Sequence, residues 1–369
     1  MRCNVTELPV PESERAGEDV GVWCERMRVR VRESVTDFVD ARCREHLDFP
    51  ETAVLAQVIT DFVARGKYLR SAFQLAGWLA VEPERRAAVR AAASAELLHC
   101  FALMQDDVMD QSALRRGMPA AHVWFAQWHR CQGFSGESKR FGESAAVLAA
   151  DLCLVWAEQL LRESGVSASA LARVMPHYAA MRSELAVGQF RDLVNDSVRR
   201  PALGDVLAVA RAKSGNYTVR RPLELGAMLA GASPEVLAAL ARYGAAVGEA
   251  FQLRDDLLGV FGDPEVTGKP VGDDIRARKA TSVLVSARDH AEGSAAAELD
   301  RLDALAELPA AAVSRYVAIL ADMGTRERVE KLIEHRVHEG LAAVADAAIS
   351  PRAHAVLTHL AHSCTDRTY

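Results

Sequence analysis

A pair of neighbouring aspartates ends a strongly apolar segment in the first third of this sequence. Asp106 and Asp107 follow the segment 97–104, and Asp110 comes one helical turn after Asp106. Residues four apart lie on one face of a helix, so the carboxylates of Asp106 and Asp110 repel each other unless a cation lies between them. Mg²⁺ prefers oxygen ligands and often joins carboxylates to substrate phosphates. The pattern therefore indicates either a magnesium site or a solvated acidic helix end.

A second acid pair, Asp255 and Asp256, ends another apolar segment much later in the chain. Two such pairs are harder to explain as solvated helix ends than one. If they face each other across a helical bundle, they line its mouth with oxygen ligands for several metal ions.

Basic residues accompany both acid pairs. Each of these basic residues, taken alone, is explained as a solvated charge on the protein surface. Together with metal-binding carboxylates, arginine forks and lysine ammonium groups describe a diphosphate site. Their presence in an otherwise apolar helical chain predicts an apolar substrate with a diphosphate head. The residues concerned are Lys67, Arg70, Arg115, Arg116, Lys213, Lys269 and Lys279.

The elements that must position these residues are helices. From Val22 onward apolar residues recur at helical spacing, and no alternating run predicts a strand. We expect an all-α fold in which residues 21–369 form a single large helical bundle, preceded by a flexible N-terminal tail of residues 1–20. The predicted helices are 22–46, 50–65, 69–81, 84–111, 119–129, 143–163, 168–194, 203–217, 219–230, 234–260, 277–292, 296–305, 309–322, 324–347 and 351–362.

Composition excludes several classes of protein. Half of the 369 residues are hydrophobic and 25% are charged, which excludes global disorder. The net charge of −6 disfavours a nucleic-acid-binding protein. Seven scattered cysteines without a C-x-x-C motif, and no secretory signal, predict a cytoplasmic protein with reduced thiols. The longest apolar stretch, 145–161, contains Asp151 and Glu158, so we expect no membrane span.

Between residues 66 and 281 the sequence resembles the trans-isoprenyl diphosphate synthases, also called polyprenyl synthetases. Several motifs of that family occur here in the family's order. The first acid pair with Asp110 and the following Arg115-Arg116-Gly117 is similar to the first aspartate-rich motif of that family. The second pair and its loop are similar to the second motif, with Gly259 in place of its last aspartate. Shorter matches are Gly66-Lys67 with Arg70, Gly188-Gln189 with Asp192, Lys213-Ser214 with Tyr217-Thr218, Thr267-Gly268-Lys269-Pro270 and Gly272-Asp273-Asp274.

The resemblance implies a role for each matching residue. It implies a bundle of the isoprenoid synthase type with a central apolar cavity, and the use of three Mg²⁺ ions per site. The implied catalytic residues are Asp106, Asp107, Asp110, Asp255, Asp256 and Lys213, of which Asp106, Asp110 and Asp255 are the direct metal ligands. Isopentenyl diphosphate is implied to bind Lys67, Arg70, His99 and Arg116, and the allylic diphosphate Arg115, Lys213, Ser214, Gln252, Lys269 and Lys279.

The implied activity is a condensation. The allylic C–O bond ionises with help from Mg²⁺, the double bond of isopentenyl diphosphate attacks the carbocation, and a proton is lost.

Three residues around the motif Gly66-Lys67 with Arg70 depart from the family pattern. Arg65 stands where glycine is usual, Tyr68 where arginine is common, and Ser71 where proline is common.

The product length is implied by the residues five and four positions before the first motif, Phe101 and Ala102. One aromatic residue followed by a small one resembles synthases that make the C20 product, geranylgeranyl diphosphate. A C15 farnesyl diphosphate synthase remains the alternative, and Phe101 is equally well explained by core packing. The family is generally homodimeric, and the resemblance places the interface on helices between the N-terminal third and the first motif.

Two other readings stay open. A class I terpene cyclase shares the bundle and the first acid motif, but Asn195-Asp196 does not continue into its second metal motif. A non-catalytic partner subunit is expected to have lost metal ligands, which are intact here. The C-terminal histidines, from His335 to His362, are too loosely spaced for a metal site and are best explained as surface residues.

Overall fold

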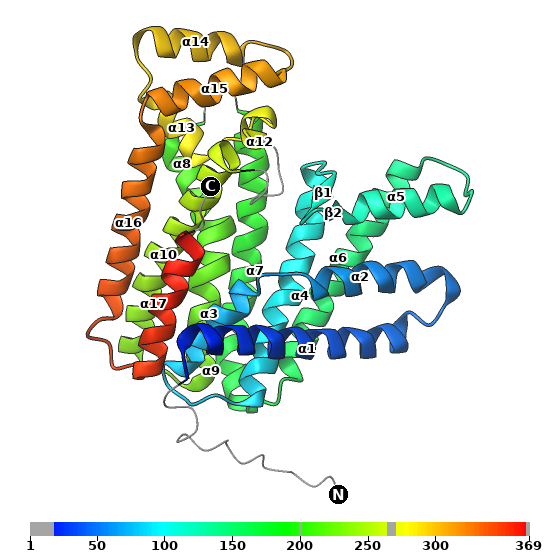
Figure 1. Cartoon of the computed structure of the whole chain (residues 1–369). Coiled ribbons are helices and arrows are strands. Elements are labelled where there is room, and N and C mark those ends of the chain that lie inside the picture. The colour runs from blue at the N-terminus through cyan, green and yellow to red at the C-terminus, as the bar shows by residue number, and fades with distance from the viewer. Residues whose placement is uncertain (1–17, 199–200, 264–270, 367–369) are drawn as a thin grey trace, which may run out of the picture. The chain divides into compact units, whose positions relative to one another are not determined.

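The computed structural model describes residues 18–198, 201–263 and 271–366. Of these described residues 79% are helical, which confirms the all-α prediction. The first half contains α1 (Val20–His46), the short 3₁₀ turn η2 (Pro50–Thr52), α2 (Ala53–Ala64), α3 (Leu69–Leu79), α4 (Arg86–Met109), β1 (Leu114–Arg115), β2 (Met118–Pro119), α5 (Ala121–Cys131), α6 (Ser138–Arg162) and α7 (Ala168–Ser197). The second half contains α8 (Leu203–Ala210), η3 (Arg211–Arg220), α9 (Arg221–Ala230), α10 (Pro234–Phe261), α12 (Asp273–Arg276), α13 (Ser282–Asp289), α14 (Gly293–Asp303), α15 (Ala310–Asp322), α16 (Thr325–Val344) and α17 (Pro351–Thr365) (Figure 1).

Contacts between Cα atoms divide the chain into two compact units. Unit 1 holds the described residues up to Arg173, together with Gly226–Ala232 and Ser350–Val356. Unit 2 holds Val174–Leu225, Ser233–Ile349 and the described residues from Leu357 onward. The single domain expected for residues 21–369 stays a prediction, and most of the expected N-terminal tail, residues 1–17, lies outside the described residues.

Unit 1 is built around α4. The buried face of α4 is rich in alanine, and α6 packs against it with Ala146, Ala149, Ala150 and Ala157 buried in turn. Small side chains on both helices allow the close approach. By length and composition alone α4 and α6 could each cross a membrane, but most of the apolar part of α4 is buried inside the protein, as in the core helix of a soluble protein.

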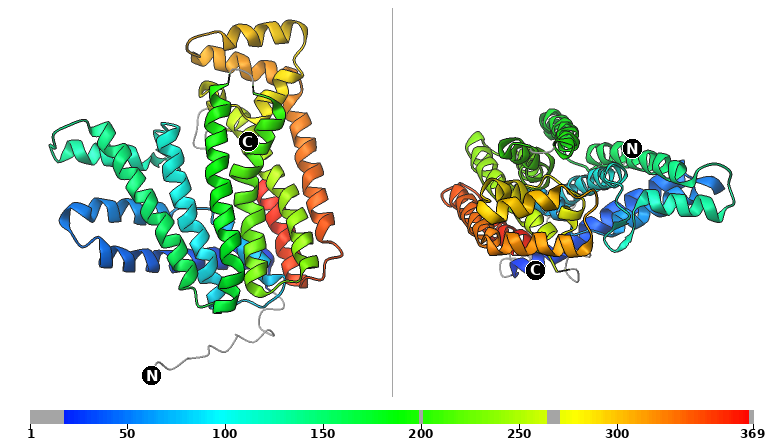
Figure 2. Two further views of the ribbon diagram at one scale, coloured as in Figure 1. Left: turned by 180° about the vertical axis from the view of Figure 1, so that it is seen from behind. Right: turned by 90° about the horizontal axis from the view of Figure 1, so that it is seen from above.

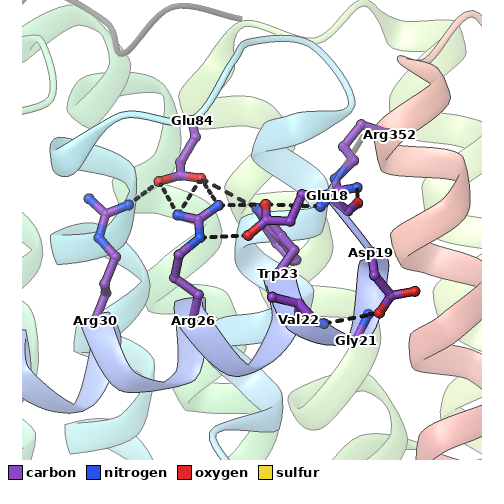
Figure 3. A network of polar contacts seen from close by, with 9 residues as sticks. All are labelled: Glu18, Asp19, Gly21, Val22, Trp23, Arg26, Arg30, Glu84 and Arg352. Atoms are coloured by element: carbon purple, nitrogen blue, oxygen red, sulfur yellow. Dashed lines mark hydrogen bonds and ion pairs between the residues drawn. The ribbon is translucent and has the colours of Figure 1, made fainter. Parts of the chain in front are cut away.

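A polar network fixes the N-terminal end of α1 within unit 1 (Figure 3). The carboxylate of Asp19 caps the helix by accepting hydrogen bonds from the backbone N–H groups of Gly21 and Val22, at 2.8 and 3.2 Å. The guanidinium of Arg26 bridges two carboxylates, Glu18 and Glu84. Glu84 precedes α4, so these ion pairs join the start of α1 to the start of the central helix.

Unit 2 is built around α10, whose neighbours are α16 and η3. In Figure 2, α10 and α16 run alongside each other, and α14 and α15 form an antiparallel pair at one end of the unit. Two glycines allow α10 to approach η3: a Cβ on Gly248 would lie 2.7 Å from the carbonyl oxygen of Gly215. Any larger residue at this crossing would force the two backbones apart.

Three local predictions differ from the structure. The expected ordinary helix 203–217 is α8 followed by a π-helix, η3, a rare form that often marks functional sites. The expected helix 277–292 begins only at Ser282, because Arg278 adopts a left-handed conformation with φ 54° that ends α12. A two-residue hairpin, β1–β2, interrupts the all-helical pattern after the first acid motif.

Candidate active site

The first acid motif lies at the C-terminal end of α4, in unit 1, and its three aspartates are not equivalent. Asp106 and Asp110 are half-buried, whereas Asp107 is fully buried. Oδ1 of Asp107 accepts a 2.8 Å hydrogen bond from Nε of Arg115. Burial raises the pKa of Asp107, and the charge and hydrogen bond of Arg115 oppose that rise. Asp106 and Asp110 are therefore the accessible carboxylates of the motif, and Asp107 is held by Arg115.

The hairpin after α4 explains the Arg-Arg-Gly sequence. The two residues between β1 and β2 are Arg116 and Gly117, with φ of 54° and 75°. Positive φ at both central residues defines a type I′ turn, for which glycine is favoured at the second position. Arg115, the last residue of β1, turns back to Asp107 and also lies 3.4 Å from Oδ2 of Asp106.

Three arginines surround His99 in unit 1. Burial lowers the pKa of His99 well below its usual value, and the positive charges of Arg70, Arg116 and Arg115 lower it further. His99 is therefore neutral at neutral pH, beside a concentration of guanidinium groups. Such a group of cations is suited to bind a polyanion such as a diphosphate. The structure thus brings together three of the four residues predicted for isopentenyl diphosphate, while the fourth, Lys67, has an exposed side chain just before α3.

A buried glutamate that the sequence analysis did not single out fixes the start of α3. Oε1 of Glu96, on α4, accepts a 3.0 Å hydrogen bond from the backbone N–H of Ser71. A carboxylate is favourable at a helix N-terminus because of the helix dipole. Tyr68, the unusual residue before α3, is buried and its hydroxyl donates to the carbonyl of Val63. An acid inside the apolar segment 86–104 was the available signal for Glu96.

The two residues expected to set product length are both on α4. Phe101 and Ala102 are half-buried, so neither is completely enclosed by its neighbours in unit 1. Ala102 precedes Asp106 by four residues and shares its face of the helix.

In unit 2, the π-helix η3 carries Lys213 and Ser214. The ammonium of Lys213 lies 2.6 Å from Oδ2 of Asp192 on α7. Gly188, one helical turn before Asp192, allows α7 and η3 to approach each other, since a Cβ there would lie 3.0 Å from the backbone nitrogen of Lys213. The two mid-chain motifs are thereby brought into one cluster, with Ser214 half-buried beside it.

The second acid motif repeats the arrangement of the first. On α10, Asp255 is half-buried and Asp256 is buried. Oδ2 of Asp256 accepts hydrogen bonds from the backbone N–H of Ser282, at 2.9 Å, and from its hydroxyl. Oδ1 accepts from the side-chain amide of Gln252. Burial raises the pKa of Asp256 to about 7 against the opposing effect of these hydrogen bonds.

Gly259 stands where the family motif often has its last aspartate, and another carboxylate fills that space. A Cβ on Gly259 would lie 1.9 Å from Oδ2 of Asp274. A larger residue at 259 would displace Asp274, so the two positions are linked. Asp274 is an acid beside the second motif whose position the sequence could not give.

The remaining predicted residues are placed as follows. Lys279 follows α12 in unit 2, and Lys269 lies outside the described residues. Arg254, next to Asp255, is buried and pairs through both terminal nitrogens with Glu330 of α16. The histidines of α16 and α17 form no metal-binding group among the described residues.

The donor set is compatible with Mg²⁺ bound together with a substrate. The described residues contain no group of three acidic, histidine or cysteine side chains placed to hold a metal alone. Mg²⁺ usually keeps several waters and binds through one or two carboxylates and substrate phosphates. The half-buried Asp106, Asp110 and Asp255 fit this requirement, because each retains access to solvent.

Comparison with known proteins agrees with this chemistry. The polyprenyl synthetase family model matches residues 52–318. A geranylgeranyl diphosphate synthase of Mycobacterium tuberculosis is 35% identical over 288 residues, covering 78% of this chain and 77% of the relative. A (2E,6E)-farnesyl diphosphate synthase of Mycobacterium bovis is 33% identical over 323 residues, covering 82% of this chain and 80% of the relative.

A similar solved structure is the geranylgeranyl pyrophosphate synthase from Corynebacterium glutamicum, complexed with isoprenyl diphosphate and magnesium. It is 36% identical, has a TM-score of 0.88, and the match covers 95% of this chain and all of that one. An all-α fold with two aspartate motifs and a group of arginines defines an enzyme of isoprenyl diphosphates. This chain belongs to the polyprenyl synthetase family and is a trans-prenyltransferase, as the motifs predicted.

Proposed function

We propose that this prenyltransferase extends allylic diphosphates with isopentenyl diphosphate to geranylgeranyl diphosphate, the C20 product. The observation that carries the product length is the half-buried Phe101 followed by the small Ala102, one turn before Asp106. The similarity to two geranylgeranyl diphosphate synthases supports it. Farnesyl diphosphate is the alternative, supported by the similarity to the enzyme from Mycobacterium bovis.

We assign the Mg²⁺ ions, three per site, to Asp106, Asp110 and Asp255, the accessible aspartates of the two motifs. When bound, the ions neutralise charge on the departing diphosphate. Asp107 and Asp256 keep the ligands in place, because each is buried and accepts hydrogen bonds, Asp107 from Arg115 and Asp256 from Ser282.

The chain's own residues then have separate tasks. Arg70, Arg116, His99 and Lys67 hold isopentenyl diphosphate, and Arg115, Lys213, Ser214, Gln252, Lys269 and Lys279 hold the allylic diphosphate. Neutral His99 binds by hydrogen bonding rather than as a cation, since burial, and then the charges of the neighbouring arginines, lower its pKa. No side-chain nucleophile is required, and the released diphosphate accepts the proton lost from the condensation product. Apolar walls keep water from the carbocation.

We propose a cytoplasmic homodimer that uses the outward face of α6. Leu148 and Val155 are about three-fifths exposed on this helix, and Leu152 lies between them on the same face. Exposed apolar residues at helical spacing, here beside the exposed Asp151, are typical of a helix that packs against a partner. A second copy of this chain is the occupant we propose, and this position follows the first acid motif rather than preceding it as the resemblance implied.

A primer series tests the proposed activity and product. Purified protein receives Mg²⁺, labelled isopentenyl diphosphate and a C5, C10 or C15 allylic diphosphate in turn, and the dephosphorylated products are sized by chromatography. A single C20 alcohol is expected from each primer. A C15 alcohol as the end product would overturn the product length alone. No elongation with any primer, or a hydrocarbon formed from geranylgeranyl diphosphate alone, would overturn the proposed reaction.

A further inference from the structure

We propose that the carboxylates of Asp196 and Asp256 are positioning residues that hold the backbone of residues 278–282, the Lys279 segment, and thereby place the ammonium of Lys279 for the allylic diphosphate. The inference rests on the proposed function, in which Lys279 binds that diphosphate. All residues concerned belong to unit 2.

The Lys279 segment begins where α12 ends in an unusual cap. The N–H of Arg278 bonds to the carbonyl of Ile275 at 3.1 Å, and the N–H of Lys279 bonds to the carbonyl of Asp274 at 2.9 Å. This pair of bonds is a Schellman motif, which places its left-handed residue at Arg278, with φ 54°. Glycine is usual there, so the arginine conformation must be stabilised from elsewhere.

Part of that stabilisation comes from the side chain of Arg278. Its guanidinium donates hydrogen bonds to the backbone carbonyls of Asp303, at 3.0 Å, and Leu305, at the end of α14. The contacts fix the beginning of the segment, but they do not reach the residues after Lys279.

Two carboxylates bind the backbone after Lys279. The N–H of Ala280 donates a 3.1 Å hydrogen bond to Oδ1 of Asp196, near the C-terminal end of α7. The N–H and hydroxyl of Ser282 both donate to Oδ2 of Asp256 on α10. Lys279 is therefore followed directly by a stretch whose alternate residues are tied to two different helices.

Packing encloses only the end of this stretch, since Ser282 is buried whereas Lys279 and Ala280 are half-buried. A cavity of about 600 Å³ borders the segment, with Lys279, Ala280 and Leu284 among the residues of its wall. A backbone that faces a cavity gains little from dispersion contacts on that side. The hydrogen bonds to Asp196 and Asp256 therefore contribute to where the backbone after Lys279 lies.

Asp196 is the better residue to test, because it lies outside both acid motifs. Asp196→Ala removes the acceptor for Ala280, whereas the amide oxygen of Asp196→Asn can still accept that hydrogen bond. Ser282→Ala removes the hydroxyl donor to Asp256 and keeps the backbone N–H. Asp322→Ala is the matched control, since Asp322 is an exposed acid at the end of α15.

Two readouts are measured for each variant. The first is hydrogen exchange of the peptide covering the Lys279 segment, followed by mass spectrometry. The second is the KM for the allylic diphosphate compared with the KM for isopentenyl diphosphate. We expect Asp196→Ala to accelerate hydrogen exchange in this peptide. The KM for the allylic diphosphate should rise roughly tenfold, whereas the KM for isopentenyl diphosphate should stay within about twofold of the wild type. Ser282→Ala should show the same pattern with about a threefold change, and Asp196→Asn and Asp322→Ala should resemble the wild type.

A double variant tests whether Asp196 acts through Lys279. In a Lys279→Ala background, Asp196→Ala should raise the allylic KM no further, because the positioned group is gone. A further increase, an equal increase in both KM values, or unchanged exchange in Asp196→Ala would overturn the proposal. If the wild type elongates no allylic diphosphate, the proposed function fails. In that case the affinity of each variant for inorganic diphosphate with Mg²⁺ is measured in place of KM. Asp196→Ala must then weaken this affinity, while Asp196→Asn and Asp322→Ala leave it unchanged.

Discussion

At the scale of single residues, the two acid motifs share a division of labour. In each, the first aspartate keeps access to solvent, whereas the second is buried and bound by hydrogen bonds, Asp107 by Arg115 and Asp256 by Ser282 and Gln252. A direct metal ligand needs an accessible oxygen, and a buried carboxylate needs partners. The sequence shows two identical Asp-Asp pairs, so this difference could only come from the fold.

Phe101 is expected to limit product length. Phe101→Ala removes the aromatic ring and leaves the smaller Ala102 as its neighbour, so the chain should be elongated beyond C20 by at least one C5 unit. Product chromatography after dephosphorylation measures the change. Leu103→Ala, a half-buried residue on the same helix, is the matched control and should leave the product unchanged. A C20 product from Phe101→Ala would refute this role.

His99 is expected to make stability depend on pH. The pKa of His99 is lowered in the folded protein from its usual value of 6.5, so the unfolded chain binds a proton more readily. The stabilisation is present above pH 6.5 and is lost as the pH falls below it, by at most about 1.4 kcal/mol per pH unit.

The measurement for His99 is the free energy of unfolding in urea between pH 7.5 and 5. His99→Gln cannot titrate, so its stability should decline less steeply below pH 6.5 than that of the wild type. Equal slopes for the two proteins would show that His99 is not the group responsible.

At the scale of elements, short irregular segments position the basic residues. The β1–β2 hairpin turns Arg115 toward Asp107, η3 carries Lys213 beside Asp192, and the left-handed Arg278 precedes Lys279. Helical periodicity predicts long helices such as α4 and α10 well, because their apolar faces repeat. Helical periodicity does not predict a π-helix or a left-handed cap, since both depend on contacts with distant residues.

Gly117 is expected to support the hairpin. Gly117→Ala meets no atom within 4 Å, so its cost is the left-handed backbone conformation, about 1 kcal/mol. Because Gly117 follows Arg116, the KM for isopentenyl diphosphate should rise severalfold. Gly133→Ala has the same backbone cost at φ 66°, also in open space, but lies between α5 and α6. Steady-state kinetics of both variants would contradict the prediction if the two KM values rose equally.

At the scale of the whole molecule, the sequence gives the class of fold and enzyme but not every residue of the site. The ordered motifs predicted the polyprenyl synthetase family, and the family model confirms it. The positions of Glu96, Asp274 and Glu330 were not predicted, because each lies against a residue well separated in sequence: Ser71, Gly259 and Arg254. A single sequence can mark an unusual acid such as Glu96, but it does not show which residue that acid contacts.

The exposed face of α6 is expected to form the subunit interface. Leu148→Lys combined with Val155→Lys places two charges on this face and should convert a dimer into a monomer. Sedimentation velocity measures the state. Phe49→Lys is the matched control, because Phe49 is about equally exposed but precedes α2. A dimer that survives the double substitution would exclude this surface.

The most direct test of the unequal acid pairs is a Mg²⁺ titration of prenyl transfer in single variants. Asp106→Asn and Asp255→Asn should raise the Mg²⁺ concentration needed for half-maximal activity by roughly tenfold or more, because each removes a charged ligand. Asp107→Asn should lower stability and maximal activity while leaving that concentration within about twofold. An equal shift in all three variants would contradict the assignment of Asp107 as an anchor rather than a metal ligand.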